Sequence, residues 1–155
     1  MNRKLRALTL MLVVLAAGSL LLAQDNPFVG TWKLNVAKSK YTPGPAPKSS
    51  TRTWDAKGMV MVNTVSAADK NVSYGYTVRG DGKDYATMGA IPNTADKISS
   101  KKTGPDAYEA SFTKAGEHVE TTTFTVSKDG KTLTIHAIGK TPTGEFDNLQ
   151  VWEKQ

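Results

Sequence analysis

Residues 28–34 read Phe28-Val29-Gly30-Thr31-Trp32-Lys33-Leu34. Side chains alternate between the two faces of a β-strand, so the even-numbered positions of this stretch share one apolar face. The odd-numbered positions include the polar Thr31 and Lys33. Gly30 leaves space beside Trp32, which allows the indole to fold across one end of a barrel and close it. The stretch therefore predicts an opening strand with Gly30 and Trp32 as its structural motif.

The first 23 residues have the pattern of a secretory signal peptide. A basic segment at residues 3–6 precedes an apolar run over residues 7–23 that ends in small side chains. Polar chain follows without a basic flank, which favours a cleaved signal over a membrane span. We expect cleavage after Ala23, with Ala17 or Gly18 as alternative sites and an uncleaved anchor as the competing interpretation. The protein is accordingly expected to be secreted or periplasmic.

Residues 24–155 are long enough for one domain that buries most of its surface. The chain has no cysteine, which excludes disulfides and the acylated cysteine of a bacterial lipoprotein. Beyond the signal segment, 17 Lys and Arg stand against 14 Asp and Glu, spread along the chain. This pattern lacks the clustered basic residues of a nucleic-acid interface. We expect a monomer that binds no nucleic acid.

The rest of the chain shows no helical periodicity. It consists of short runs rich in Val, Thr, Tyr and Ile, separated by Gly and Asp, and such runs are typical of strands joined by tight turns. Ten of them predict an all-β fold, a single antiparallel up-and-down β-barrel. The predicted strands cover residues 28–36, 50–56, 59–65, 72–79, 83–88, 96–102, 106–114, 117–126, 131–139 and 145–153.

A Gly-x-Trp motif at the start of such a meander resembles the calycins, which include the lipocalins and the fatty-acid-binding proteins. Gly-Thr-Trp-Lys-Leu is most similar to the opening strand of the fatty-acid-binding proteins, which also have ten strands. The lipocalins' Thr-Asp-Tyr motif is approximated by Lys83-Asp84-Tyr85. Residues 37–48 are similar to a stretch of small, uncharacterised secreted bacterial proteins. The resemblance implies a barrel that holds a small hydrophobic or amphipathic molecule. We expect no cofactor.

Fatty-acid-binding proteins place a helical lid between their first two strands. Here that interval contains Pro43, Pro45 and Pro47, and alternating prolines block helical hydrogen bonds and favour extended backbone. We therefore expect a stiff loop in place of the lid.

Turn positions predict which side chains of the first half face the barrel interior. A two-residue turn at Lys57-Gly58 would set Arg52 opposite Asn63, and the connection at 66–71 would set Asn63 opposite Tyr74. Directly opposed residues of an antiparallel pair share a face. The predicted inner face carries six residues that we expect to bind the ligand: Arg52, Trp54, Met61, Asn63, Tyr74 and Tyr76.

Three further turns predict the register of later strands. Asp81-Gly82 is a hairpin signal that would place Arg79 opposite Asp84 on the outer face. A tight turn at Ala115-Gly116 puts Phe112, a further predicted cavity residue, on the face of Val119. Asp129-Gly130 sets Phe124 opposite Ile135 and Val126 opposite Leu133. Because Val119 and Phe124 differ in parity, we expect a β-bulge within residues 121–123.

Arg52, Asn63 and Tyr74 would form one polar row across three strands. A guanidinium suits a carboxylate held away from bulk water; the alternative is that Arg52 reaches solvent at the open end. Many fatty-acid-binding proteins hold the lipid carboxylate with Arg-x-Tyr near the C-terminus. The matching positions here are Gln150 and Trp152, so the family's own cation is missing, although both residues are expected to line the cavity.

Signals for catalysis are weak. His118 and His136 are predicted to lie about 17 Å apart along the sheet at ~3.3 Å per residue, too far to share a metal ion. No nucleophile elbow or phosphate loop is present, and we expect Glu109, Glu120 and Glu145 to point outward. The leading hypothesis is a protein that binds a small, partly apolar ligand without transforming it. A filled interior would favour an interaction or inhibitor module, and a buried carboxylate or His beside a cavity would favour an enzyme.

Overall fold

A computed structural model describes residues 26–155, and this part of the chain is almost entirely β-structure. The only helical element among these residues is the 3-10 turn η1 (Val36–Lys38). The prediction of an all-β fold is confirmed. The strands are β1 (Gly30–Leu34), β2 (Lys40–Thr42), β3 (Ser49–Trp54), β4 (Met59–Val65), β5 (Asn71–Thr77), β6 (Tyr85–Ala86), β7 (Met88–Gly89), β8 (Lys97–Gly104), β9 (Ala107–Lys114), β10 (Glu117–Val126), β11 (Thr132–Thr141) and β12 (Gly144–Lys154).

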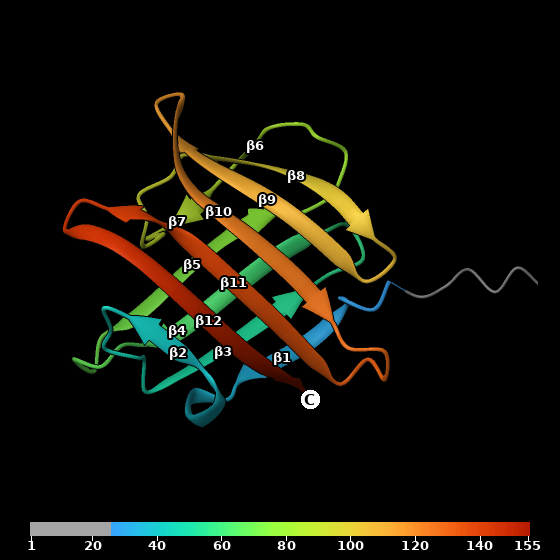
Figure 1. Ribbon diagram of the computed structural model, residues 1–155, viewed down its shortest axis with the longest axis horizontal. Helices are drawn as coiled ribbons and strands as arrows, with labels where there is room; N and C mark the ends of the chain where they lie inside the picture. The colour runs from blue at the N-terminus through green and yellow to red at the C-terminus, as the bar shows by residue number, and fades with distance from the viewer. Residues whose placement is uncertain (1–25) are drawn as a thin grey trace, which may run out of the picture.

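The strands form one antiparallel sheet in the order β6-β8-β9-β10-β11-β12-β1-β3-β4-β5-β7. The sheet wraps around so that β9–β12 cross over β1, β3, β4 and β5 (Figure 1). Its two edges belong to one short segment, because β6 pairs with β8 and β7 pairs with β5. Thr87 alone separates these two strands. The result is a nearly closed barrel of the predicted kind.

β12 is long enough to pair with two N-terminal strands in succession. Its end, residues 152–154, pairs with β1, and its middle, residues 147–149, pairs with β2. The 3-10 turn η1 connects β1 to β2, and the Asn35 side chain accepts the Lys38 backbone N–H at 3.0 Å. The proline-rich segment follows directly, so the predicted absence of a helical lid holds. The strand count is twelve rather than ten, since β2 was not predicted and the predicted strand 83–88 divides into β6 and β7.

The predicted register between β3 and β4 was wrong by one residue, because the connecting loop has three residues instead of two. Asp55 donates its backbone N–H to the Met59 carbonyl at 2.9 Å, leaving residues 56–58 as the loop. The Asp55 carboxylate accepts the backbone N–H groups of Lys57 and Met59, each at 2.8 Å. Gly58 completes the loop with φ of 84°, a conformation that favours glycine. Arg52 therefore faces Val62.

The next connection repeats this design. Ser66 donates its backbone N–H to the Lys70 carbonyl at 2.9 Å, and Asp69 adopts φ of 60° within the three-residue loop 67–69. Val62 then faces Tyr74. The two one-residue errors cancel, so Tyr74 and Tyr76 lie on the inner face as predicted. The strand between them is inverted: Met61 and Asn63 lie on the outer face, and Val60 and Val62 replace them inside.

The register of the second half agrees largely with the prediction. Glu117 faces Lys114 across the Ala115-Gly116 turn, and β10 pairs with β11 as the Asp129-Gly130 turn predicts. A bulge is present in β10, but it lies between His118 and Glu120, not within residues 121–123. This displacement changes which face Glu120 occupies.

The predicted hairpin at Asp81-Gly82 does not form, because β5 pairs with β7 while Asp81 bridges to Lys101 of β8. Arg79 consequently does not pair with Asp84. Its Nε donates to the Lys57 carbonyl at 3.1 Å, and its guanidinium lies 5.1 Å from the centre of the Tyr85 ring. Arg79 therefore secures the β3–β4 loop, and Asp84 lies 4.0 Å from Lys97 instead.

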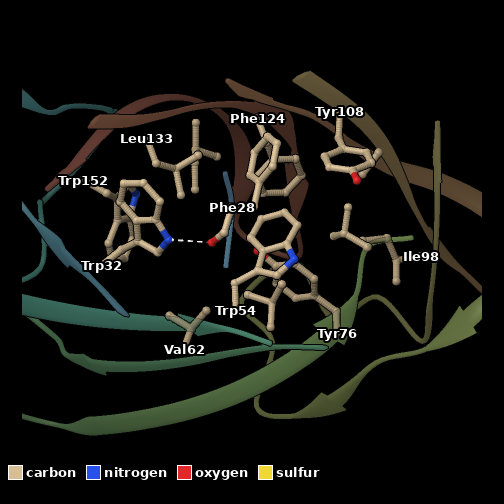
Figure 2. Packing of buried hydrophobic residues seen from close by; sticks show 14 of the residues in the cluster. Phe28, Trp32, Trp54, Val62, Tyr76, Ile98, Tyr108, Phe124, Leu133 and Trp152 are labelled. Atoms are coloured by element: carbon tan, nitrogen blue, oxygen red, sulfur yellow. Dashed lines mark hydrogen bonds between the residues drawn. The ribbon is translucent and has the colours of Figure 1, made fainter. Parts of the chain in front are cut away.

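Aromatic side chains fill one end of the barrel. Trp32 is completely buried, and its indole Nε1 donates to the Phe28 carbonyl at 2.9 Å (Figure 2). Gly30 has φ of 137°, and the space that its missing side chain leaves is taken by Lys154, whose Nζ lies 5.1 Å above the Trp32 ring. Phe28 also packs on Trp54 at a centroid distance of 4.7 Å. This aromatic plug leaves the other end of the barrel as the candidate site.

Candidate functional site

A cavity of about 570 Å³ opens at the end opposite the plug. Its rim consists of residues 41–47, 66–68, 91–93 and the β11–β12 hairpin at 141–146, with β2 and this hairpin on the left of Figure 1. The three prolines therefore stand at the mouth, where a lid would otherwise lie. The inner wall is formed by strand residues that include Arg52, Tyr74, Tyr76, Phe112, Glu120, Thr122, Ala137, Gln150 and Trp152.

Arg52 of β3 lies deep in this cavity and is only 3% exposed. Its Nη1 donates to the Tyr76 hydroxyl, and its guanidinium lies 4.7 Å from the centre of the Trp152 ring. The ion pairs among residues 26–155 do not include it, and its Nε–H has no hydrogen-bond partner in this part of the chain. Arg52 is thus a buried cation with free donor capacity, and the alternative in which it reaches solvent does not hold.

Tyrosines surround this cation. Tyr74 and Tyr76 stack at a centroid distance of 6.3 Å, and Tyr76 meets the edge of Phe112 at 5.3 Å. Burial raises the pKa of Tyr74 and of Tyr76, although the nearby Arg52 opposes the shift. Burial also raises the pKa of Tyr41 to about 12. The phenols therefore stay neutral at physiological pH and present hydroxyl groups that can donate or accept.

Glu120 of β10 is the site residue that the sequence analysis missed. A regular strand starting from the Glu117–Lys114 pair would set Val119 opposite Phe112 and turn Glu120 outward. The bulge adds one residue, so Glu120 faces Phe112 and its carboxylate lines the cavity. Its two oxygens accept hydrogen bonds from the Thr122 hydroxyl and from Asn93 Nδ2, the latter at 2.6 Å. The prediction of an outward charge at this position was wrong.

Gly139 of β11 supports this bulge, because a Cβ at that position would lie 2.3 Å from the Val119 carbonyl oxygen and 2.8 Å from Glu120 Cα. We expect Gly139→Ala to displace the bulge and lower the free energy of unfolding by about 1–3 kcal/mol, as overpacking typically does. Urea denaturation measures this change. Gly130→Ala is not a suitable control because of its positive φ; Lys140→Ala, exposed on the same strand, should change stability by no more than ~0.5 kcal/mol.

Burial raises the pKa of Glu120, although its hydrogen bonds to Thr122 and Asn93 and the charge of Arg52 act in the opposite direction. The folded protein therefore binds this proton more tightly than the unfolded chain does. Stability is lost as pH rises from the ordinary glutamate range through the raised pKa. Glu120→Gln keeps the shape and removes the charge, so it should stabilise the domain at pH 7 and have little effect at pH 4.

Thermal melts at both pH values measure this effect. A gain of ~1 kcal/mol corresponds to a rise of roughly 4 °C in a domain of this size. Glu109→Gln, an exposed position on β9, serves as the control and should leave the melting temperature unchanged at both pH values. An equal shift at pH 7 and pH 4 for Glu120→Gln would show that the carboxylate carries no buried charge.

The other predicted site residues are divided between cavity, plug and surface. Gln150 lines the cavity and accepts the Trp152 Nε1–H at 3.2 Å. Trp54 is buried in the plug below the cavity, and its indole N–H has no partner among the described residues. Met61 and Asn63 face away from the cavity; Asn63 Oδ1 accepts the Ser73 hydroxyl at 2.7 Å on the outer surface.

Both histidines lie outside the cavity. His118 contacts Thr121 at 3.0 Å, and His136 pairs with Asp147 at 2.8 Å on an exposed face. Within residues 26–155, no three His, Cys, Asp or Glu side chains lie close enough together to hold a metal ion. Within the same range, no helix has the length and apolar character to cross a membrane.

The single antiparallel meander, the Gly-x-Trp strand that pairs with the last strand, and the interior cavity define a calycin-like β-barrel. No family model and no curated protein matches the chain. Among solved structures, the chain is similar to the zebrafish ileal bile acid-binding protein complexed with cholic acid. The two share 13% sequence identity with a TM-score of 0.49, over 83% of this chain and 99% of that chain.

Proposed function

We propose that this protein binds a small, partly apolar molecule in the barrel cavity and does not transform it. The observation that supports this most strongly is Arg52: a buried guanidinium whose Nε–H has no partner among residues 26–155 opens onto a cavity of about 570 Å³. No ion pair within 4.0 Å involves Arg52 among residues 26–155, and a buried cation without a close, hydrogen-bonded counter-charge is costly. A ligand with an anionic or strongly accepting head would supply the missing partner.

The remaining wall fits the apolar part of such a molecule. Tyr74, Phe112 and Ile135 provide aromatic and aliphatic surface around the cavity. Each methylene that is removed from water there contributes about 0.8 kcal/mol. A ligand with an acidic head and an apolar chain or ring system therefore gains affinity from both of its parts.

A specific observation favours a second candidate, an enzyme on the same barrel. Glu120 is a carboxyl beside the cavity with a raised pKa, and such groups occur at catalytic sites. Its two hydrogen bonds from Thr122 and Asn93 hold it as an acceptor, however, which suits ligand recognition. The interaction-module hypothesis is less favoured, because the barrel interior is not filled.

We further propose that the domain acts outside the cytoplasm, as a secreted or periplasmic protein. The support is the pattern of residues 1–23, a basic segment followed by an apolar run and small residues. These residues lie outside the described part of the chain. Fractionation of cells that express the full chain, followed by mass determination of the exported form, tests both the location and cleavage after Ala23.

Binding in the cavity can be tested by filling it. Ala137 is 6% exposed and lines the cavity, whereas its neighbour Ile138 is 49% exposed on the opposite face. With decanoate as the probe in calorimetric titration, Ala137→Phe should abolish binding and Ile138→Phe should leave it unchanged. Unchanged binding by a folded Ala137→Phe variant would place the probe elsewhere, and failure of the wild-type protein to bind decanoate, 2-aminodecanoate and decylamine alike would oppose the proposed function.

A further inference from the structure

We infer that the ligand carries a zwitterionic head: an anionic acceptor that Arg52 binds and, near it, an ammonium donor that Glu120 binds. The inference rests on the proposed function and narrows its ligand class. The structure assigns recognition of the donor group to Glu120. This residue lies outside the C-terminal Arg-x-Tyr pattern, whose positions are Gln150 and Trp152 in this chain.

Arg52 and Glu120 lie on opposite walls of one cavity. β3 and β10 are separated in the sheet by β11, β12 and β1 on one side and by the remaining strands on the other. No ion pair joins the two side chains within 4.0 Å. Tyr76, which accepts from Arg52, and Phe112, which faces Glu120 across the β9–β10 pair, meet between them. A molecule above these two rings can reach both charges.

The surroundings of Glu120 hold its carboxylate in place as an acceptor. Asn93 is 3% exposed, and its Oδ1 accepts the Ala95 backbone N–H at 2.9 Å, so its Nδ2 is directed at Glu120. The Thr122 hydroxyl, itself on a residue 2% exposed, donates to the other oxygen. Each carboxylate oxygen retains a further lone pair. These remaining sites can accept a donor from the cavity contents, because Glu120 lines the cavity.

Charge balance selects the ligand class. A simple carboxylic acid would satisfy Arg52 and leave Glu120 as an uncompensated charge near a second carboxylate. An apolar amine would do the reverse. A head with both a carboxylate and an ammonium neutralises both walls. A hydroxyl in place of the ammonium would donate a hydrogen bond to Glu120 but leave its charge uncompensated. The favoured ligands are therefore amphiphiles of the amino-acid type.

Calorimetric titration with decanoate, 2-aminodecanoate and decylamine tests this inference at pH 7 on the unmodified domain. We expect 2-aminodecanoate to bind at least tenfold more tightly than either of the other probes, as a charge-assisted hydrogen bond predicts. Glu120→Gln should remove this preference by weakening 2-aminodecanoate about tenfold, while decanoate binds equally or more tightly. Glu109→Gln, on the outer face, should change none of the three affinities.

Two outcomes separate this inference from the proposed function. If decanoate binds and 2-aminodecanoate shows no advantage in the wild-type protein, the role of Glu120 is overturned and the proposed function stands. If no probe binds, the proposed function fails as well. The comparison of probes in the wild-type protein requires no variant, so it remains decisive if Glu120→Gln does not fold.

Discussion

Trp32→Ala is expected to lower the free energy of unfolding by ~3–5 kcal/mol, the usual range for truncation of a buried tryptophan. Trp32 is completely buried, its indole N–H is bonded to the Phe28 carbonyl, and the Lys154 ammonium lies over its ring. A domain of this kind has a total stability of ~5–15 kcal/mol, and no disulfide supplements it. The variant should consequently melt far below the wild-type protein.

Thermal and urea denaturation measure this loss, with Lys33→Ala as the control. Lys33 is the next residue of β1 and is exposed, so its removal should change stability by no more than ~0.5 kcal/mol. If Trp32→Ala melts within a few degrees of the wild-type protein, Trp32 does not close the barrel end.

The second large effect concerns affinity. Arg52→Gln should weaken binding of decanoate by roughly ten- to a hundredfold, because a charge-assisted hydrogen bond contributes ~1.5–3 kcal/mol. Binding of methyl decanoate, which has the same chain and no charge, should change much less. The structural reason is that Arg52 is the cation that lies buried in the cavity wall, bonded only to the Tyr76 hydroxyl among the described residues.

Arg79→Gln provides the matched control, since Arg79 lies outside the cavity and bonds to the Lys57 carbonyl. It should leave the affinities for acid and ester unchanged. Equal losses for the acid and the ester in Arg52→Gln would mean that the variant disturbs the cavity shape, and Arg52 would then have no role in recognising the head.

The sequence was informative about the fold because strand periodicity and turn residues are local signals. β4 and β10 have the predicted bounds, and the Ala115-Gly116 turn sets its register as expected. The lengths of the loops at 56–58 and 67–69 were not predictable from their turn residues alone. Each length depends on the side chain of the residue before the loop: the Asp55 carboxylate accepts the Lys57 backbone N–H, and the Ser66 hydroxyl accepts the Lys70 backbone N–H.

Neither β2 nor the division between β6 and β7 was predicted, because both depend on pairing with strands that are distant in the sequence. β2 is a strand only because the middle of β12 is free to pair with it. The segment around Thr87 pairs with β8 on one side and with β5 on the other, and no local pattern specifies two partners.

Part of the candidate site was predicted correctly only because two register errors cancelled. Arg52 and Tyr74 were placed on one face because two errors of one residue cancelled, whereas Met61 and Asn63, on the strand between them, were assigned to the wrong face. Glu120 was missed because its orientation depends on the position of a single bulge residue, Val119. The difference in parity along β10 did signal a bulge, but it did not locate it.

Native mass spectrometry of the protein purified from its own host tests most directly whether the cavity holds a small molecule. We expect an added mass on the folded wild-type protein that is lost on denaturation and is absent from Ala137→Phe. Fragmentation of the released molecule should show an apolar body with an acidic group. Retention of the same mass by the folded Ala137→Phe variant would contradict binding in the cavity, and so would its absence from the wild-type protein together with failure to bind decanoate, 2-aminodecanoate or decylamine.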